Sequence, residues 1–214
     1  TFGLMHEIHQ QYNLKPRFFI LFADYGLNDK NIPVNNDRFQ ILIKSLADYA
    51  HVGIHPSYAS NKAPALLAKE IAGLGQVVKA EITESRQHFL MLSFPETYRN
   101  LINLDITDDY TMGFAGQPGF RAGICSPFRW YDLDSETITD LTLHPFALME
   151  GTLRDYLRIE AGQAMEYIKP LIDEVKSVSG TFISLWHNES FSEQKRWVGW
   201  VEVYRAMLGY ALRS

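Results

Sequence analysis

Hydrophobic positions along the chain follow two spacings, one typical of strands and one typical of helices. Short apolar runs predict buried strands over residues 17–22, 51–55, 85–90, 109–114, 119–124, 141–149 and 181–186. Between most of these runs, apolar residues recur every three or four positions. This spacing predicts helices over residues 2–12, 39–49, 63–77, 160–178 and 197–212, with one more beginning near Ser93. The alternation predicts an α/β fold whose mainly parallel sheet has about seven strands.

The sequence gives no sign of a domain boundary. No internal repeat, low-complexity tract or linker rich in Pro, Gly and Ser interrupts the alternation, so residues 1–214 are expected to form a single domain. With 46% hydrophobic and 21% charged residues, the composition is that of an ordinary globular protein with a substantial core. The net charge of −5 and the scattered Lys and Arg argue against nucleic-acid binding.

The sequence also argues against disulfides, cysteine-rich metal sites and membrane spans. Cys125 is the only cysteine, which excludes a disulfide within the chain and a cysteine-rich metal site. No apolar run approaches the ~18 residues expected of a membrane span. No export signal is visible, which favours the cytoplasm but leaves the compartment open.

The most informative feature is that four of the apolar runs end in histidine or arginine. These residues are His55, Arg86 with His88, Arg121, and His187. In a barrel, the carboxyl ends of parallel strands converge on one rim, where active sites are built. The four strand ends are therefore expected to contribute to one site.

Two of these ends suggest metal or anion binding. Pro56 stops the strand at His55, and imidazole is both a common metal ligand and a group that titrates near neutral pH. Alternatively, His55 is a structural histidine bonded to loop backbone. Arg86 and His88 lie two residues apart and so share one face of a strand, either facing the rim or facing outward on an edge strand.

The other two ends suggest substrate binding and proton transfer. Arg121 lies between two glycines, where its guanidinium can clamp a carboxylate or phosphate. Alternatively, it pairs structurally with Asp109, Asp132 or Glu150. His187 closes a buried strand, where a neighbouring carboxylate could tune it as an acid or base.

Other polar residues are assigned weaker roles. Asp24, near the end of the first strand, is a candidate rim carboxylate. The remaining histidines are expected at the surface or in loops, and they are His6, His9, His51 and His144.

As an ordered set, the strand ends resemble the polysaccharide deacetylases of the NodB-homology type, in a divergent bacterial branch. The phrases that carry the resemblance are His55-Pro-Ser-Tyr58, Ser85-Arg-Gln-His-Phe-Leu90, Gly119-Phe-Arg-Ala-Gly123 and Leu185-Trp-His-Asn188. The resemblance implies a deformed (β/α) barrel of about seven strands. It also implies hydrolysis of N-acetyl or O-acetyl groups on sugars by one divalent metal, which activates water and polarises the acetyl carbonyl.

The resemblance assigns roles residue by residue. His55 matches the first histidine of the family's His-x-x-x-His metal motif, whereas Ala59 stands where the second histidine belongs. Arg86 matches the arginine motif of the next strand, and the neighbouring His88 is a candidate for the lost ligand. The metal implied is zinc, with nickel or cobalt as alternatives. His187 matches the histidine that protonates the leaving amine.

One family motif has no counterpart here. The Asp-Asp pair, which supplies the base and a metal ligand, belongs to a strand before the helix that opens this chain at Phe2. Either this strand lies upstream of Thr1, or the protein lacks those carboxylates. Because a barrel without its first strand has unpaired edges, we expect an upstream segment or a partner chain to cover the gap.

Two hypotheses about function follow. The first is a metal-dependent hydrolase that removes acetyl groups from a carbohydrate, with His55 and His88 on the metal, Arg86 and Arg121 orienting carboxylates or substrate, and His187 as the acid. The second is a non-catalytic barrel that binds carbohydrate or acts as a scaffold in a cell-envelope polysaccharide pathway. Its aromatic residues available to stack on sugars are Tyr58, Trp130, Tyr131 and Trp186.

Overall fold

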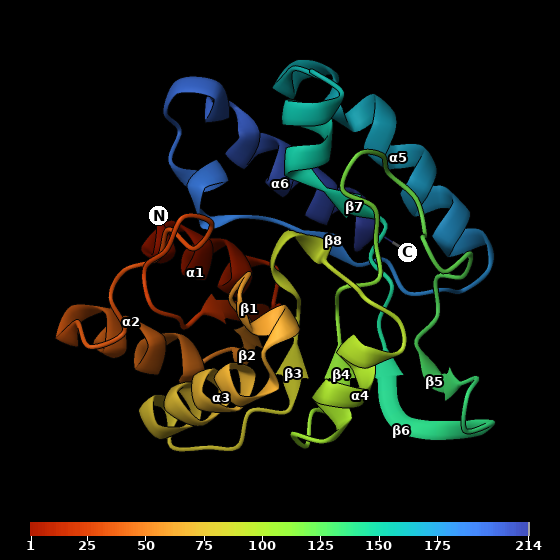
Figure 1. The fold of residues 1–214 in the computed structure, drawn as a ribbon. Coiled ribbons are helices and arrows are strands. Elements are labelled where there is room, and N and C mark those ends of the chain that lie inside the picture. Colours follow the sequence, from red (N-terminus) through yellow and green to blue (C-terminus); the bar gives the residue numbers. More distant parts are fainter. Residues whose placement is uncertain (214) are drawn as a thin grey trace. The chain divides into compact units, whose positions relative to one another are not determined.

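The structure, a computed structural model, describes residues 1–213 as two compact units. We call them the sheet unit, which comprises Lys15–Thr111 and Phe128–His144, and the helical unit, which comprises Thr1–Leu14, Met112–Pro127 and the chain from Pro145 onward. Figure 1 shows their elements along the chain.

The sheet unit is built on a six-stranded sheet in which all neighbouring strands are parallel except one pair. In spatial order the strands are β1 (Arg17–Leu21), β2 (His51–His55), β3 (Glu84–Ser85), β4 (Asp108–Asp109), β6 (Thr137–Leu143) and β5 (Phe128–Asp132). The exception is the antiparallel hairpin of β5 and β6. The predicted α/β class with a mainly parallel sheet is confirmed.

Amphipathic helices pack on one face of this sheet. They are α2 (Asp37–Ala47), α3 (Pro64–Val78) and α4 (Glu96–Ile102), with short 3-10 turns at η1 (Ser60–Lys62) and η2 (His88–Leu90). The Asn36 side chain caps α2 by accepting a hydrogen bond from the Phe39 N–H, and Pro64 begins α3. Figure 1 shows α2 and α3 beside β1 and β2. The fully buried residues of the helices and strands form the core of this unit, and they include Ile43, Ile54, Leu74, Leu141 and Leu143.

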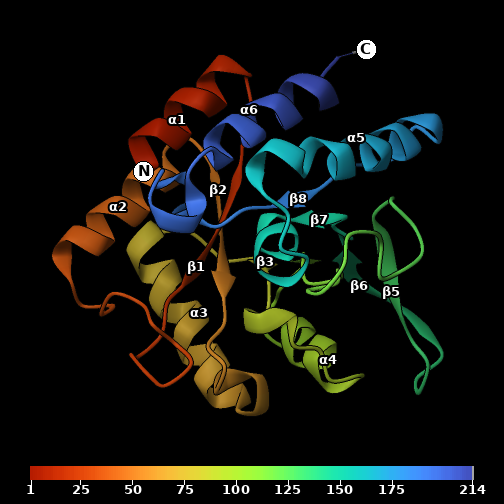
Figure 2. The same cartoon turned by 90° about the horizontal axis from the view of Figure 1, so that it is seen from above.

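The helical unit contains three longer helices and a two-stranded parallel sheet. Its elements are α1 (Phe2–Gln11), β7 (Leu148–Met149), the π-helical turn η3 (Thr152–Tyr156), α5 (Ala161–Ser177), β8 (Ser184–Leu185), the 3-10 turns η4 (Asn188–Phe191) and η5 (Lys195–Trp197), and α6 (Trp200–Ala211). Figure 2 shows α6 between α1 and α5. Trp200, Phe146 and Leu153 are among the fully buried side chains of its core.

Contacts between α1 and α6 correct one expectation about the histidines. His9, expected at the surface or in a loop, is only 3% exposed. Its Nε2 lies 2.9 Å from the hydroxyl of Tyr204 on α6. The spacing of apolar residues in α1 did not reveal this, because burial of His9 depends on a helix almost two hundred residues away.

Three strand predictions differ from the structure. The predicted strand at 85–90 ends at Ser85, because Phe89 and Leu90 adopt left-handed backbone (φ 56° and 53°) that cannot extend a strand. The run at 119–124 is a turn rather than a strand, with positive φ at Gly119 and Gly123. The run at 141–149 belongs to two strands, because β6 ends at Leu143 and β7 begins only at Leu148.

One further strand is shorter than predicted, and one hairpin was not predicted. The predicted strand at 109–114 is represented only by β4 at Asp108–Asp109. The hairpin of β5 and β6 was not foreseen, because the exposed faces of both strands obscure their apolar positions.

Candidate functional site

In the sheet unit, His55 is the last residue of β2, level with Leu21 at the end of β1. Its Nδ1 is hydrogen-bonded to the backbone carbonyl of Arg86. A carbonyl oxygen only accepts, so Nδ1 carries the proton and the lone pair of this imidazole is on Nε2. The backbone bond is the one that a structural histidine would make, and it also sets the tautomer that a metal ligand needs.

A second imidazole lies beside the first. His88 opens η2, and its ring centroid is 4.8 Å from that of His55. The Nδ1 of His88 lies 2.9 Å from Oδ1 of Asp29, a buried residue of the loop between β1 and α2. The carboxylate accepts a hydrogen bond from Nδ1, so the lone pair of His88 is also on Nε2. The two imidazoles therefore have the same tautomer, each fixed by an oxygen.

Asp29 was missed by the sequence reasoning. It lies in a loop rich in Asn and Asp, where carboxylates are ordinarily solvated, so nothing local distinguishes it. Asp24, the carboxylate proposed instead, is exposed and lies 3.6 Å from the ammonium of Lys69. Only the contact between Asp29 and His88 in the folded chain identifies the carboxylate that orients His88.

Arg86 directly follows β3, and its backbone N–H donates to the carbonyl of Ile54. The expectation that Arg86 and His88 share one strand face is wrong, because the strand has already ended. The next N–H, that of Gln87, donates to the Thr111 hydroxyl instead of to a neighbouring strand. The guanidinium of Arg86 lies over the ring of Phe19, 5.0 Å from its centroid.

Two buried carboxylates hold the loop that follows His55. Asp29 accepts the N–H of Tyr58 at 2.9 Å, through the same oxygen that meets His88. Glu70 of α3 accepts the N–H of Ser57 at 3.0 Å. Burial raises the pKa of Glu70, and hydrogen bonds from Ser57 and Ser60 oppose that rise. The loop is therefore fixed from both sides.

A further carboxylate is buried completely in the sheet. Asp109 of β4 accepts hydrogen bonds from the hydroxyls of Ser85 and Thr111 and from the Thr111 N–H. Burial raises its pKa to about 6, although these hydrogen bonds favour the ionised form. This network stabilises the strand ends that carry Arg86 and His88.

Asp108, the neighbour of Asp109 in β4, pairs with His144, a histidine to which the sequence assigned no role. The Asp108 carboxylate lies 2.6 Å from Nε2 of His144, whose ring stacks on Tyr110 with centroids 4.3 Å apart. These contacts make His144 part of the sheet's packing.

In the helical unit, His187 follows β8 and caps η4. Its backbone N–H and its Nδ1 lie 2.6 and 2.9 Å from one oxygen of Glu150, the residue after β7. Glu150 is 0% exposed, whereas the His187 side chain is 50% exposed. The buried carboxylate thus orients an accessible imidazole, as the sequence had led us to consider.

Arg121 is exposed in the turn at 119–124. Each of its three proposed carboxylate partners has a contact of its own within its unit. Asp132 pairs with Arg99, Asp109 with the two hydroxyls, and Glu150 with His187. Within the helical unit, Glu150 therefore pairs with His187 rather than with Arg121, whereas a pairing of Arg121 with Asp109 or Asp132 and the clamp stay predictions.

The aromatic residues named for sugar stacking have different environments. Trp130 is buried against Tyr98, whereas Trp186 is half-buried and packs on Tyr204. Tyr131 is exposed on β5. Tyr58 is exposed and makes an edge contact with Phe89, which the sequence reasoning had not singled out.

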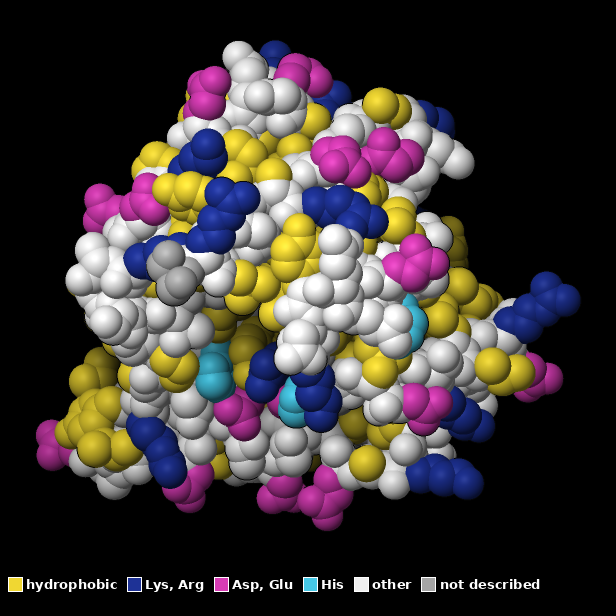
Figure 3. Space-filling model, turned by 180° about the vertical axis from the view of Figure 1, so that it is seen from behind, with side chains coloured by type: hydrophobic (Ala, Val, Ile, Leu, Met, Phe, Trp, Pro, Cys, Tyr) yellow, Lys and Arg dark blue, Asp and Glu magenta, His cyan; other side chains and the backbone are white. Residues whose placement is uncertain are grey.

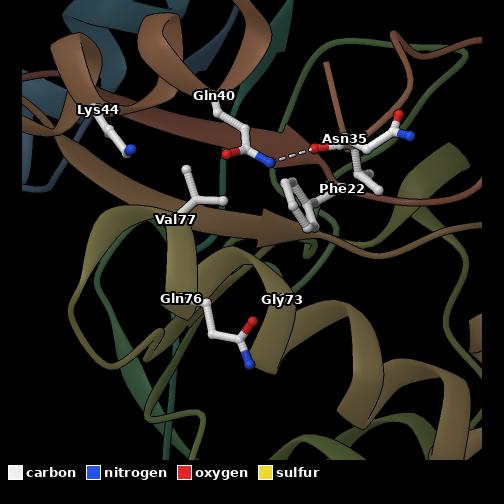
Figure 4. Close-up of a pocket in the computed structure, with 8 residues that line it drawn as sticks. Phe22, Asn35, Gln40, Lys44, Gly73, Gln76 and Val77 are labelled. Carbon is white, nitrogen blue, oxygen red and sulfur yellow. Dashed lines mark hydrogen bonds between the residues drawn. The ribbon is translucent and has the colours of Figure 1, made fainter. Parts of the chain in front are cut away.

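Two hollows occur in the sheet unit. One of about 290 Å³ lies between α2 and α3, and Figure 4 shows Gln40 and Lys44 from α2 and Gln76 from α3 around Phe22. No imidazole or carboxylate lines it, so it lacks the groups of a hydrolytic site. The other, of about 600 Å³, is lined by the start of α3 and one side of α4.

The surface charge, the helix lengths and the grouping of metal-binding side chains were compared with the sequence predictions. On the face in Figure 3, Lys and Arg are interspersed with Asp and Glu rather than gathered in one basic patch. Within residues 1–213, no helix has the length and apolar character needed to cross a membrane. Over the same residues, no three side chains of His, Cys, Asp or Glu are grouped so as to hold a metal ion.

Comparison with solved structures identifies a similar fold. The chain is similar to the crystal structure of a putative polysaccharide deacetylase from Mycobacterium smegmatis, with a TM-score of 0.68. The match covers 97% of this chain and 68% of that chain, at 14% sequence identity. No family model matches the chain, and no curated protein matches it. The comparison therefore supports the predicted α/β fold with a mostly parallel sheet, whereas closure into a barrel and membership of the NodB-homology family stay predictions from the sequence.

Proposed function

We propose that this protein is a carbohydrate deacetylase-like hydrolase, which removes acetyl groups from a saccharide. The observation that carries the proposal is the adjacent pair His55 and His88, each fixed through Nδ1 by an oxygen. The similarity of fold to the Mycobacterium smegmatis structure supports the same class of reaction. We also propose that the sheet closes into a deformed barrel.

The donor set fits part of a divalent metal site. Two imidazoles of the same tautomer suit zinc, nickel or cobalt, and a metal-bound histidine usually donates its Nδ1–H to an oxygen. Catalytic zinc sites commonly have three protein ligands, and residues 1–213 supply no group of three. We propose His55 and His88 as two of the ligands, with Asp29 as the residue that positions His88. When bound, such a metal lowers the pKa of its water and polarises the acetyl carbonyl.

The remaining residues have roles that follow from their own contacts. Glu150 holds His187 through Nδ1, so Nε2 is the ring nitrogen left to exchange a proton with a substrate. Protonation of the leaving nitrogen or oxygen by His187 is the step that we propose. Arg86 and Arg121 are proposed to orient carboxylates or substrate, because guanidinium groups bind oxygen anions through paired N–H donors.

The metal is tested by binding and by activity in the same protein. Zinc, nickel and cobalt would be titrated into metal-stripped protein, and metal content would be measured by elemental analysis. Acetate release from an acetylated chito-oligosaccharide would then be followed. We expect His55→Ala and His88→Ala to lose both metal and acetate release. His51→Gln, at the opposite end of β2, should retain both.

The same two assays distinguish the role of His187 from metal binding. His187→Ala should retain the metal and lose about 10²–10⁴-fold in kcat, the range typical of a lost general acid. Acetate release that persists in metal-free protein carrying His55→Ala would refute the metal-dependent mechanism. A protein that releases no acetate with any of the three metals would not be a deacetylase of these saccharides.

A second function is favoured by one specific observation. Ala59 replaces a family ligand, and the described residues offer two imidazoles rather than a group of three metal-binding side chains. A non-catalytic carbohydrate-binding or scaffolding protein needs no more than this. Saccharide binding without acetate release, in the presence of each metal, would favour this alternative.

A further inference from the structure

One peptide group beside the histidine pair is hydrogen-bonded at both of its ends. It joins Arg86 to Gln87, directly after β3. Its carbonyl, which belongs to Arg86, accepts the Nδ1–H of His55 at the end of β2. Its N–H, which belongs to Gln87, donates to the hydroxyl oxygen of Thr111 at 2.9 Å. Rotation of this one peptide group would therefore break both bonds.

Thr111 is held in turn by a buried carboxylate. Its hydroxyl donates to Oδ2 of Asp109 at 2.8 Å, and its N–H donates to Oδ1 at 3.0 Å. A hydroxyl has a single proton, so the proton lies on the carboxylate side and the lone pairs of Oγ1 accept the Gln87 N–H. Asp109 and Thr111 are both 0% exposed, so bulk water does not compete for these bonds.

Three hydrogen bonds thus run in the same direction from His55 to Asp109, and we call this chain the relay. The imidazole donates to the peptide carbonyl, the peptide N–H donates to Thr111, and Thr111 donates to the carboxylate. Hydrogen bonds aligned in this way polarise one another in a protein interior. Burial raises the pKa of Asp109 to about 6, so at pH 8 the relay ends on a negative charge.

The relay links His55 to a carboxylate, as direct contact does for His88. His88 has the Asp29 carboxylate on its Nδ1 at 2.9 Å. His55 has only a backbone carbonyl on its Nδ1, which carries no net charge of its own. Through the peptide group and Thr111, however, this carbonyl is connected to Asp109. Both imidazoles are therefore tied to a buried carboxylate, one directly and one through the relay.

We propose that Asp109 is a positioning residue for His55, which it holds through Thr111 and the peptide group with Nδ1 protonated and Nε2 ready to bind a divalent cation. Outer hydrogen-bond partners of a ligating histidine fix its tautomer and make it a stronger ligand. This inference rests on the proposed role of His55 as a metal ligand. It deepens that role, because it names the distant residue that controls the ligand.

Two variants would interrupt the relay at different points. Thr111→Val retains the shape of the side chain without the hydroxyl, and Asp109→Asn removes the negative charge. Nitrogen NMR of the imidazoles in metal-free protein at pH 8 shows which ring nitrogen carries the proton. We expect the Nδ1–H form alone for His55 in the wild type, and a mixture with the Nε2–H form in both variants.

Hydrogen exchange of the Gln87 N–H measures the middle of the relay. The reference is the Arg86 N–H, which donates to the Ile54 carbonyl and reports any general loss of stability. The ratio of the two exchange rates, Gln87 to Arg86, should rise about tenfold in Thr111→Val. In Thr111→Ser, which retains a hydroxyl, the ratio should stay that of the wild type.

Metal affinity connects the relay to the proposed site. Cobalt would be titrated into metal-stripped protein in competition with a chelator. Asp109→Asn and Thr111→Val should each bind it about tenfold more weakly, at the lower end of the range for outer partners of a ligand. The matched control is Ser85→Ala. It removes the other hydroxyl on Asp109, which is at 2.7 Å and equally buried but outside the relay, and should bind cobalt like the wild type.

The outcomes distinguish the relay from the metal site. An unchanged exchange ratio and an unchanged His55 tautomer in Thr111→Val would overturn the relay. Equal losses of cobalt affinity in Ser85→Ala and Thr111→Val would also overturn it, because Asp109 would then act on the fold as a whole. If the wild type bound no cobalt but the tautomer and the exchange ratio changed as expected, the relay would stand and the metal site would fall.

Discussion

Replacing His9 by glutamine tests how burial of one imidazole controls stability. His9 is 3% exposed in the helical unit, and its Nε2 lies 2.9 Å from the hydroxyl of Tyr204. Burial, with a smaller contribution from the nearby charge of His6, lowers the pKa of His9 from 6.5 to about 4. Glutamine retains a hydrogen-bonding group near the position of Nε2 but does not titrate.

The sign and size of the effect follow from the two pKa values. Between pH 6.5 and 4, His9 is protonated in the unfolded chain but neutral in the folded one. The stability that it contributes is therefore present above pH 6.5 and is lost progressively as the pH falls from 6.5 to 4. At about 1.4 kcal/mol for each pKa unit, the loss is about 2 kcal/mol between pH 7 and pH 5. The complete loss, at lower pH, is about 3 kcal/mol.

The measurement is the difference in unfolding free energy between wild type and His9→Gln, by urea denaturation from pH 7 to pH 4.5. A difference is needed because Asp109 acts in the opposite direction. Its pKa is raised to about 6, so the stability associated with it is lost as the pH rises through that value. We expect the wild type to lose about 2 kcal/mol more than His9→Gln between pH 7 and pH 5.

A variant on the same helix separates the two causes of the lowered pKa. His6→Gln removes the neighbouring imidazole but leaves His9 buried, so it should retain most of the pH dependence. If wild type and His9→Gln lost the same free energy between pH 7 and pH 5, folding would not lower the pKa of His9, and the argument from its burial would be refuted.

Two backbone predictions are tested by urea denaturation at a single pH. Lys79→Gly should raise the unfolding free energy by about 0.5–1 kcal/mol, because Lys79 ends α3 with a left-handed φ of 57° that glycine adopts without strain; an unchanged or lower value would contradict this. Gly53→Ala should lower it by about 1–3 kcal/mol, because an added Cβ would lie 2.6 Å from the Glu84 carbonyl oxygen and 2.8 Å from the Phe19 ring. The control Gly162→Ala, in α5 with open space around its Cβ, should instead gain about 0.5–1 kcal/mol, and a loss equal to that of Gly53→Ala would contradict the steric argument.

The sheet unit and the helical unit each contain a histidine whose ring is oriented by a carboxylate. In each, a buried carboxylate meets the Nδ1 of a histidine, with Asp29 on His88 and Glu150 on His187. This contact fixes which ring nitrogen carries the proton, so that the other can accept a proton or bind a cation. The histidines were visible in the sequence as residues near strand ends, whereas their carboxylates were not.

The sequence by itself determined most of the helices, the first two strands and the position of a histidine at the end of β2. Helices α2, α3, α5 and α6 and strands β1 and β2 were predicted from the spacing of their apolar residues, because burial of one face imposes that spacing locally. His55 was placed correctly at the end of β2, since Pro56 stops the strand.

Only the tertiary structure decided which residues meet these histidines. Asp29 and His88 are 59 residues apart, and Glu150 and His187 are 37 apart. No local pattern encodes such pairs, because they depend on how crossover connections bring separate loops together. The left-handed turn at Phe89, which ends the predicted strand early and exposes the ring, is likewise decided by contacts around the loop rather than by its own residues. Apolar periodicity specifies which side of an element is buried, whereas packing of the elements decides which polar groups share a site.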